Sequence, residues 1–447
     1  MNRHVIIHLV ASLLLSSFLA QTLPGQTSLK EQFSGIAGQA AAKNFSGIVV
    51  AEKNGSVLAS QSFGYADAKS MTPIDSKTLF EIASVTKPFT SLAIIRLELE
   101  GKLSLDDSIG EHLPNVPDNC RDITIRHLMQ HTSGIPGTNY GPHNDDIGEV
   151  TKAYLRGGPK QKPGTRFEYW NQGYALLAAI ISVTSKQTYQ DAMQNLVLRP
   201  TKMNASCFTG DKPSEGLTVS TGRSTRGPDR SAVEHPYGIS YGLQYQGMGG
   251  LVSNTDDLVR FVETLRESKP LLEKILQPGP NGNYGLGWRI EKLNDTDRRV
   301  FHSGAVRGFL AAVSWYPEHD SSIIVLANTD DGRSFSFIET SCRRAFEANA
   351  IPLPIAQSFN EDFRDAVVGQ FTLGSRVITV SEAGEGLRMI IDWGGAKTFG
   401  KLAKSEAEDR LRYLDGSDDD ISVSFEAELD EKYQTLILMD RKYIRRK

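Results

Sequence analysis

Ser84 and Lys87 stand three residues apart at the start of a run that reads as a helix. At this spacing two side chains share one face of a helix, about one turn apart. A serine hydroxyl is a weak nucleophile, and catalysis by serine requires a base within reach. Apolar residues flank the pair, so we expect Lys87 to be partly buried, and burial lowers the pKa of a lysine toward that of a useful base. The alternative is that Ser84 caps the helix and that Lys87 is solvated.

Two further motifs contain residues suited to the same chemistry. Tyr169 and Asn171 lie two positions apart, so in an extended segment their side chains point the same way. A phenol near a lysine can pass on a proton, and an amide can hold the lysine or a substrate carbonyl. His302-Ser303-Gly304 closes a strand-like run, where a basic side chain can face a substrate and a glycine lets the backbone approach it. The alternative for the tyrosine motif is an aromatic cluster at the start of a helix.

Two other residues compete for catalytic roles, and we reject both. Residues 238–242 read G-x-S-x-G around Ser240, a motif that needs a strand before it and a helix after it. Here the motif lies in a glycine-rich loop, and the next helix is expected only near Asp256. His131, in the sequence His-Thr-Ser-Gly, is interpreted as a residue that braces a loop rather than a catalytic base.

The composition excludes several classes of function. The chain of 447 residues has a net charge of −4 and no basic stripe interleaved with aromatic residues, which argues against nucleic acid as a partner. The basic residues of 441–447 are interpreted as a solvated end. No H-E-x-x-H motif occurs, so we expect neither a metal site nor a cofactor. Three cysteines, Cys120, Cys207 and Cys342, allow one disulfide with a spare thiol, or none.

The N-terminus is typical of an export signal. Arg3 supplies a positive charge, and residues 9–20 form a short apolar stretch that is too short for a comfortable membrane span. We therefore predict a signal peptide over 1–22 and a periplasmic or extracellular protein; the alternative is an uncleaved N-terminal membrane anchor. No second apolar stretch approaches the length of a membrane span.

Helices and strands are expected in an order that places strands at both ends of one domain. An Asn54-Gly55 turn joins two strand-like runs, and a long segment at 205–245 that lacks periodicity is interpreted as a functional loop or lid. The expected strands are 47–52, 56–63, 284–290, 300–303, 309–316 and 322–328, and the expected helices are 29–43, 85–100, 174–183, 189–198, one beginning at 254 or 255, and 335–349. This order favours an α+β domain whose two ends meet in one antiparallel sheet.

A Pro-Leu-Pro sequence at 352–354 marks a boundary, after which the pattern changes. Six short β runs follow, at 367–373, 377–381, 387–391, 398–403, 421–428 and 435–439, separated by turn residues. Closely spaced strands without helices are typical of a small sandwich or barrel. We therefore expect one large domain at 28–350 and a small all-β domain at 357–447.

Taken together, these motifs resemble those of the serine β-lactamase and penicillin-binding protein superfamily, in particular class C β-lactamases, D-alanyl-D-alanine carboxypeptidases and related esterases. The S-x-x-K signature of that group matches Ser84 and Lys87, and its K-T-G element matches His302-Ser303-Gly304. Tyr169-x-Asn171 stands in place of the S-D-N element. The resemblance covers roughly residues 30 to 350. It implies an antiparallel sheet flanked by helices with an inserted, mainly helical region, and the C-terminal part loosely matches lipocalin-like barrels.

The resemblance also implies roles for individual residues. Ser84 would attack a carbonyl, with Lys87 and Tyr169 moving its proton. Asn171 would orient Lys87 and contact the substrate. Backbone N–H groups of Ser84 and Ala305, next to Gly304, would form the oxyanion hole. His302 replaces the lysine of K-T-G, and because a histidine titrates near neutrality we expect a substrate carboxylate to bind more weakly at pH 8 than at pH 6.

The function implied is that of an exported serine hydrolase that cleaves an ester or amide through a Ser84 acyl-enzyme. Its substrate would be a D-amino-acid peptide, including cell-wall fragments, or a carboxylic ester. The alternatives are a β-lactamase, a non-catalytic penicillin-binding sensor or scaffold on the same fold, and a cell-wall interaction protein that binds through its barrel. The sequence leaves the oligomeric state open.

Overall fold

The computed structural model describes most of the chain after residue 27. The described residues are 28–42, 44–137, 145–225, 227–236, 242–280, 283–293, 296–351, 367–383, 386–392, 397–404, 411–414, 421–426, 435–438 and 441–445. The expected signal peptide and Ser240 lie outside these residues.

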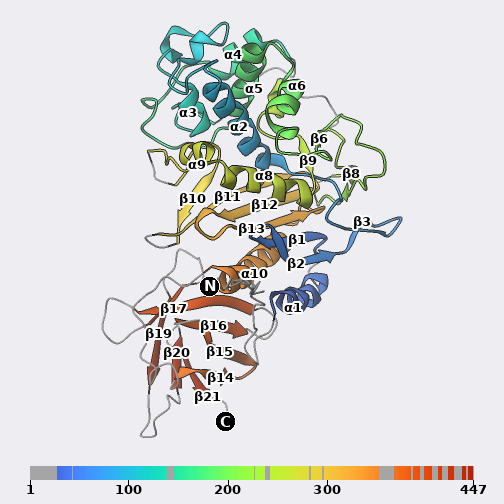
Figure 1. The fold of residues 1–447 in the computed structure, drawn as a ribbon, viewed down its shortest axis with the longest axis vertical. Helices are drawn as coiled ribbons and strands as arrows, with labels where there is room; N and C mark the ends of the chain where they lie inside the picture. The colour runs from blue at the N-terminus through green and yellow to red at the C-terminus, as the bar shows by residue number, and fades with distance from the viewer. Residues whose placement is uncertain are drawn as a thin grey trace, which may run out of the picture.

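A six-stranded antiparallel sheet crosses the middle of the molecule (Figure 1). Its strand order is β10-β11-β12-β13-β1-β2, with β1 Gly47–Lys53, β2 Ser56–Phe63, β10 Arg289–Lys292, β11 Arg298–Val306, β12 Phe309–Tyr316 and β13 Ser321–Ala327. Asn54 and Gly55, which join β1 to β2, both have positive φ, as a two-residue hairpin requires. Since β1 pairs with β13, the two ends of this part of the chain meet in one sheet, as the sequence predicts.

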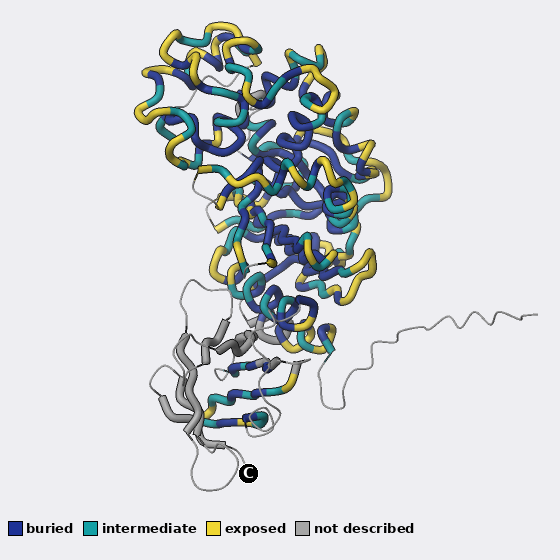
Figure 2. Tube along the Cα trace, turned by 60° about the vertical axis from the view of Figure 1, so that its left-hand side comes forward, coloured by how far each residue is buried: buried dark blue, intermediate teal, exposed yellow. Residues whose placement is uncertain are grey.

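The central strands are buried on both faces, and the side chains of alternate residues pack into two separate cores. Val313 and Ile324 point into the core shared with the large helical region, whereas Leu310 and Val325 point into the core shared with α1 (Leu29–Ala42) and α10 (Gly332–Ala350). This division follows from the two-residue period of a strand. Figure 2 shows the buried residues as a continuous band through the part of the molecule formed by this sheet and its helices.

The helical region lies on the face of the sheet opposite to α1 and α10 (Figure 1). Its helices are α2 Thr86–Leu99, α3 Ile125–Met129, α4 Ile147–Tyr154, α5 Asn171–Ser185, α6 Tyr189–Met193, α7 Leu243–Gln246, α8 Thr255–Glu267 and α9 Lys269–Ile275. One-turn helices lie at Ala83–Val85, Ile109–Glu111, Asp118–Cys120 and Pro317–His319, and a π-helical turn at Gln194–Leu198 extends α6. Small strands complete the region at β3 Tyr65–Asp67, β4 Thr72–Pro73, β5 Phe80–Glu81, β6 Cys207–Phe208, β7 Thr221–Gly222, β8 Arg230–Ser231 and β9 Leu251–Ser253.

One predicted strand is largely wrong. The sequence predicts a strand at 284–290, but β10 begins only at Arg289, and Tyr284 forms an isolated bridge to Arg289. Gly287 lies between them with φ +85°, a conformation that side chains rarely adopt. The chain therefore turns back on itself here, and glycine rather than a pleated strand determines the path.

Eight C-terminal strands form a closed antiparallel barrel. They are β14 Gly369–Leu373, β15 Arg376–Ala383, β16 Gly386–Asp392, β17 Lys397–Lys404, β18 Leu411–Leu414, β19 Ile421–Glu426, β20 Thr435–Leu438 and β21 Arg441–Arg445. Residues 441–445 of the expected solvated basic end form β21, which pairs with both β20 and β14 and so closes the barrel; the solvation of their side chains stays a prediction. The expected α+β class with a small all-β C-terminal part is confirmed, whereas the exact domain boundaries stay a prediction.

Two further expectations concern cysteines and membranes. Cys120, Cys207 and Cys342 are all free and buried, so the structure favours the alternative without a disulfide. Within the described parts of the chain, no helix combines the length and apolar character needed to span a membrane.

Candidate active site

Ser84 lies in the tight helical turn Ala83–Val85 that leads directly into α2. Ala83 has φ +47°, which is costly for a residue with a side chain and fixes the backbone just before the serine. Ser84 is half-buried, and Lys87 is fully buried one turn further along. The Lys87 Nζ lies 2.9 Å from the Ser84 Oγ, so the predicted pair is brought together.

Lys87 has an environment that destabilises its charge. Its Nζ also donates a hydrogen bond to the carbonyl oxygen of Met248, at 3.0 Å. Among the described residues no carboxylate pairs with it, and burial holds the pKa of Lys87 well below its usual value. A buried amine without a counter-charge favours its neutral form, which can accept a proton.

Tyr169 lies beside the lysine. The Nζ of Lys87 is 5.0 Å from the centre of its ring, and burial raises the pKa of Tyr169 to about 12, with a hydrogen bond to Ser84 opposing the shift. His131 fixes the segment that carries this tyrosine, because its Nδ1 accepts from the N–H of Trp170 and its carbonyl oxygen accepts from the N–H of Glu168. This geometry agrees with a bracing role for His131.

His302 is held by two hydrogen bonds within the protein. Its Nδ1 donates to the carbonyl oxygen of Ser303 at 2.8 Å, so Nε2 is the acceptor facing the hydroxyl of Tyr284 at 3.2 Å. Burial, helped by Lys87, lowers the pKa of His302 to about 3. This shift opposes the expectation that the imidazole titrates near neutrality, and we therefore expect no loss of carboxylate binding between pH 6 and pH 8 on its account.

Gly304 allows β11 to approach the nucleophile. A Cβ at this position would lie 2.2 Å from the carbonyl oxygen of Ile82 and 3.0 Å from the backbone nitrogen of Ser84. Only a glycine fits so close to another backbone. Ala305 follows as an exposed residue of β11 and lines the same cavity as Ser84.

Asn171 is the predicted site residue that the structure does not bring to Lys87. It is the first residue of α5, and its side chain is exposed. The described hydrogen bonds of the Lys87 amine go to Ser84 and Met248. The role of Asn171 in orienting the lysine therefore stays a prediction.

Ser84 opens into a cavity of about 570 Å³ that Tyr169, Arg289 and His302 also line. The sequence analysis missed Arg289, although it directly follows the Tyr284–Trp288 segment. Its guanidinium lies 6.0 Å and 5.9 Å from the ring centres of Phe167 and Tyr284, and among the described residues no carboxylate pairs with it. Arg289 is thus the cation of the cavity that remains available to a ligand.

Glu81 is a second residue that the sequence analysis missed. This carboxylate is fully buried and forms an ion pair with Arg230 and a hydrogen bond with the hydroxyl of Tyr245. Burial raises the pKa of Glu81, and both partners oppose that shift. A lone glutamate in the apolar sequence around Ser84 was the available signal, since buried charges are almost always paired.

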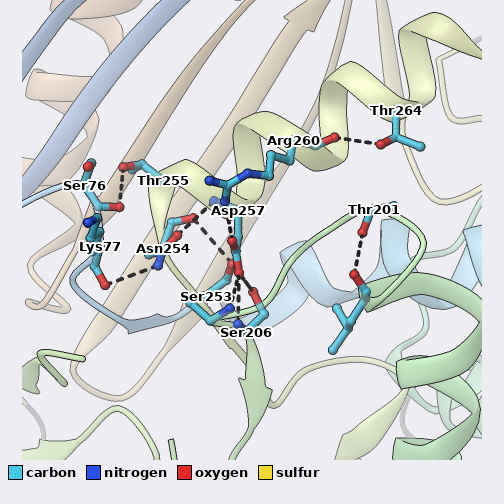
Figure 3. Close-up of polar contacts among 12 residues, drawn as sticks. Ser76, Lys77, Thr201, Ser206, Ser253, Asn254, Thr255, Asp257, Arg260 and Thr264 are labelled. Carbon is cyan, nitrogen blue, oxygen red and sulfur yellow. Dashed lines mark hydrogen bonds and ion pairs between the residues drawn. The ribbon is translucent and has the colours of Figure 1, made fainter. Parts of the chain in front are cut away.

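The segment 205–245 was expected to be a loop or lid, but its described parts are anchored at several points. Figure 3 shows Asp257, at the start of α8, accepting hydrogen bonds from the backbone N–H and the hydroxyl of Ser206, while it also pairs with Arg260. Asp330 accepts from the backbone of Thr225, and Arg230 binds Glu81. These contacts, of which those of Ser206 and Arg230 are buried, anchor the described parts of the segment, and its role as a lid stays a prediction.

The site therefore combines a serine hydroxyl, a buried amine within hydrogen-bonding distance and a neighbouring phenol. That arrangement defines a serine acyl-transfer centre on an α+β fold. Residues 33–340 match the family model described as Beta-lactamase. The chain belongs to the β-lactamase family and is a serine hydrolase of the β-lactamase and penicillin-binding-protein type, which confirms the resemblance at the level of the superfamily.

Individual proteins support this assignment. The chain is 32% identical to "Penicillin-binding protein 4*" of Bacillus subtilis (strain 168) over 318 residues, which cover 65% of this chain and 70% of that protein. It is 30% identical to "Protein flp" of Staphylococcus aureus (strain MRSA252) over 62% of this chain and only 58% of that protein. The solved structure of the octameric penicillin-binding protein homologue from Pyrococcus abyssi is similar, with a TM-score of 0.59, 25% identity, and coverage of 93% of this chain and 99% of that one.

Proposed function

We propose that this protein hydrolyses an ester or amide through an acyl-enzyme on Ser84. The observation that carries the proposal is the 2.9 Å contact between the Ser84 hydroxyl and a buried lysine that has no described counter-charge. The neutral Lys87 amine, assisted by the Tyr169 phenol, takes the hydroxyl proton as Oγ attacks the carbonyl carbon. The proton then passes to the leaving group, and a water molecule attacks the acyl-enzyme to release the acid.

The oxyanion that forms during attack needs preorganised donors. The backbone N–H groups of Ser84 and Ala305 are the proposed donors, because Gly304 lets β11 approach the segment of Ser84 closely. A donor pair of this kind lowers the barrier only if it is already in place. Gly304 is therefore proposed to position the Ala305 N–H and to take no part in the reaction itself.

We propose a D-amino-acid peptide or a carboxylic ester as the substrate. Arg289 supports a substrate with a carboxylate, because it lines the cavity of Ser84 with no described counter-ion. It takes over the role that the sequence assigned to His302, which is neutral at physiological pH. An Arg289→Gln protein should show a raised KM for a D-alanyl peptide and an unchanged KM for an uncharged ester; equal changes for both would contradict this role.

The protein is proposed to be exported to the periplasm or the cell exterior, on the strength of the N-terminal charge and apolar stretch. Intact mass measurement of the protein recovered from fractionated cells tests this proposal. A full-length chain found in the cytoplasmic fraction would contradict it.

The test of the proposed reaction is hydrolysis of p-nitrophenyl butyrate by the wild type, Ser84→Ala and Ser240→Ala. We expect activity in the wild type and in Ser240→Ala and none in Ser84→Ala. If Ser84→Ala retains wild-type activity, the assignment of the nucleophile is wrong. If the wild type forms a lasting acyl adduct on Ser84 without turnover, as intact mass would show, the sensor alternative replaces the hydrolase.

A further inference from the structure

The cavity that contains Ser84 continues beyond the catalytic cluster, around β11, onto the opposite face of the sheet. Its lining there includes Ser303 and Ala305 of β11, Ala312 of β12 and Ser336 of α10. The pairing of β10 with β11 ends at Phe301, so β10 does not cover the later part of β11. The cavity passes around this part of the strand and so joins the two faces of the sheet.

Small side chains on the sheet form the floor of this extension. Ala305 lies opposite Leu310, and Ser303 lies opposite Ala312, so the two pairs follow each other along β11 and β12. Residues two apart on a strand share a face, and both pairs therefore line the same surface. Alanine and serine fill little of the space above the sheet, which leaves a hollow behind the strand that carries His302 and Gly304.

Small side chains on α10 form the facing wall. Gly332, Ser336 and Thr340 all line the cavity, and their spacing of four places them in one row along the helix. From Gly332 to Thr340 the helix rises about 12 Å, and from Leu310 to Ser314 the strand extends about 13 Å. The two surfaces thus border a long groove that begins near Ser84.

Ion pairs lie at the far end of the groove. Arg343 binds Glu339 at 2.9 Å, and Arg299 binds Glu291 at 2.6 Å, so neither guanidinium is available to a substrate. Nearer to Ser84 the groove has apolar contacts, because Leu310 and Phe335 line it. A chain lying in the groove would therefore meet apolar and hydroxyl-bearing side chains along its length and paired charges only at its end.

We infer that this groove binds an apolar chain that the substrate carries on one side of its scissile bond. The inference rests on the proposed function, because the chain reaches the groove from a carbonyl held at Ser84. Small residues on both surfaces leave room for the chain, and Leu310 and Phe335 give it apolar contacts. The groove thus selects medium-chain esters or amides over short ones.

Two series of esters test the inference in the wild type. The first varies the acyl chain of p-nitrophenyl esters from acetate through butyrate and hexanoate to octanoate, and the second varies the alcohol of alkyl acetates over the same lengths. We expect kcat/KM to rise about threefold per added methylene in one of the two series, on the order of a hundredfold from butyrate to octanoate. Profiles independent of length in both series would overturn the inference.

Three tryptophan variants on α10 locate the chain. Ser336→Trp should remove the gain for octanoate and leave acetate hydrolysis unchanged. Thr340→Trp, one helical turn further from Ser84, should affect only the longest chains. Arg333→Trp is the matched control on the same helix, because Arg333 is exposed and does not line the groove. A length profile that is the same in Ser336→Trp as in the wild type would overturn the inference.

A binding measurement tests the groove independently of the proposed reaction. Titration calorimetry of octanoate and acetate with the Ser84→Ala protein needs no turnover. We expect octanoate to bind at least about tenfold more tightly than acetate, and Ser336→Trp to abolish the difference. Equal affinities for octanoate and acetate would overturn the inference. If the wild type is inactive but octanoate still binds more tightly than acetate, only the proposed hydrolysis is contradicted.

Discussion

Two fully buried ionisable residues flank Ser84 at equal distances along the chain, and their surroundings differ. Glu81, three residues before the serine, has a guanidinium and a phenol as partners. Lys87, three residues after it, has a hydroxyl and a backbone carbonyl. Both lie in the same apolar core, so burial alone does not distinguish a structural charge from a reactive group. The partners distinguish them.

The difference assigns a separate task to each side of the nucleophile. A buried carboxylate bound by a guanidinium and a phenol ties the Arg230 segment to β5, just before Ser84, which is a positional task. An amine with only neutral acceptors is driven toward its uncharged form, which is a chemical task. If this division is correct, removing each residue should affect a different measured quantity.

The largest expected effect comes from Lys87→Met. We expect kcat/KM for p-nitrophenyl butyrate to fall on the order of a thousandfold, because the proposed base is lost. We also expect Tm at pH 7 to rise. The lowered pKa means that the folded state binds fewer protons than the unfolded chain at neutral pH, a cost that disappears as pH rises past the ordinary lysine pKa. A variant that loses both activity and stability would contradict the division of tasks.

Glu81→Ala should act mainly on stability. Loss of one partner leaves the buried Arg230 without its counter-charge, at a cost of about 3–5 kcal/mol in the free energy of unfolding. Urea denaturation measures this cost. Glu100→Ala is the matched control, because Glu100 pairs with Lys102 at the surface, where such a pair contributes at most about 1 kcal/mol. Equal costs for the two variants would show that the Glu81 pair is no stronger than a surface one.

Gly304→Ala should lower activity with a smaller change in stability. The added methyl group would lie 2.2 Å from the Ile82 carbonyl oxygen, so β11 must move away from the Ser84 segment. A displacement of about 1 Å in a catalytic site can reduce the rate on the order of a hundredfold. Gly35→Ala, where a Cβ meets nothing within 4 Å, is the control in the same assay. Wild-type kcat in Gly304→Ala would argue against a preorganised Ala305 N–H.

The smallest effect concerns His302. Because its pKa lies at about 3, the ratio of KM values for a carboxylate substrate and its uncharged analogue should stay constant within about twofold between pH 6 and pH 8. Over a wider pH range, kcat/KM should rise as Lys87 loses its proton, at a pH below the ordinary lysine pKa. A KM ratio that increases several-fold by pH 8 would mean that His302 carries the charge after all.

Most of the fold follows from local patterns in the sequence. The Asn54-Gly55 hairpin, the helix after Ser84 and the antiparallel sheet joining both ends were predicted, because each depends on turn chemistry or on periodicity over a few residues. The prediction of a strand at 284–290 failed because Gly287 adopts a positive φ, which a pleated strand does not allow. The strand at 441–445 was not predicted, because its charged sequence gives no local signal of the pairing that makes it part of the barrel.

The sequence predicted the proposed catalytic residues of the site but not the residues that surround them. Ser84, Lys87 and Tyr169 were singled out by residue type and spacing. Met248 could not be, because it contributes a backbone carbonyl, which any residue possesses. Glu81, Arg230 and Tyr245 come together only through tertiary contacts between distant segments. The pKa of His302 likewise depends on burial, which residue type does not reveal.

The pairing of β1 with β13 has a consequence for the way the chain folds. Glu52 and Ser322 form a hydrogen bond although 270 residues separate them in the sequence. Contacts of such high sequence separation make folding slow, because the closing of the intervening chain precedes any gain from the contact. During synthesis the ribosome releases Ser84 and Lys87 long before the strand that completes their sheet. The sheet beside the Ser84 site therefore stays incomplete until β13 has been translated.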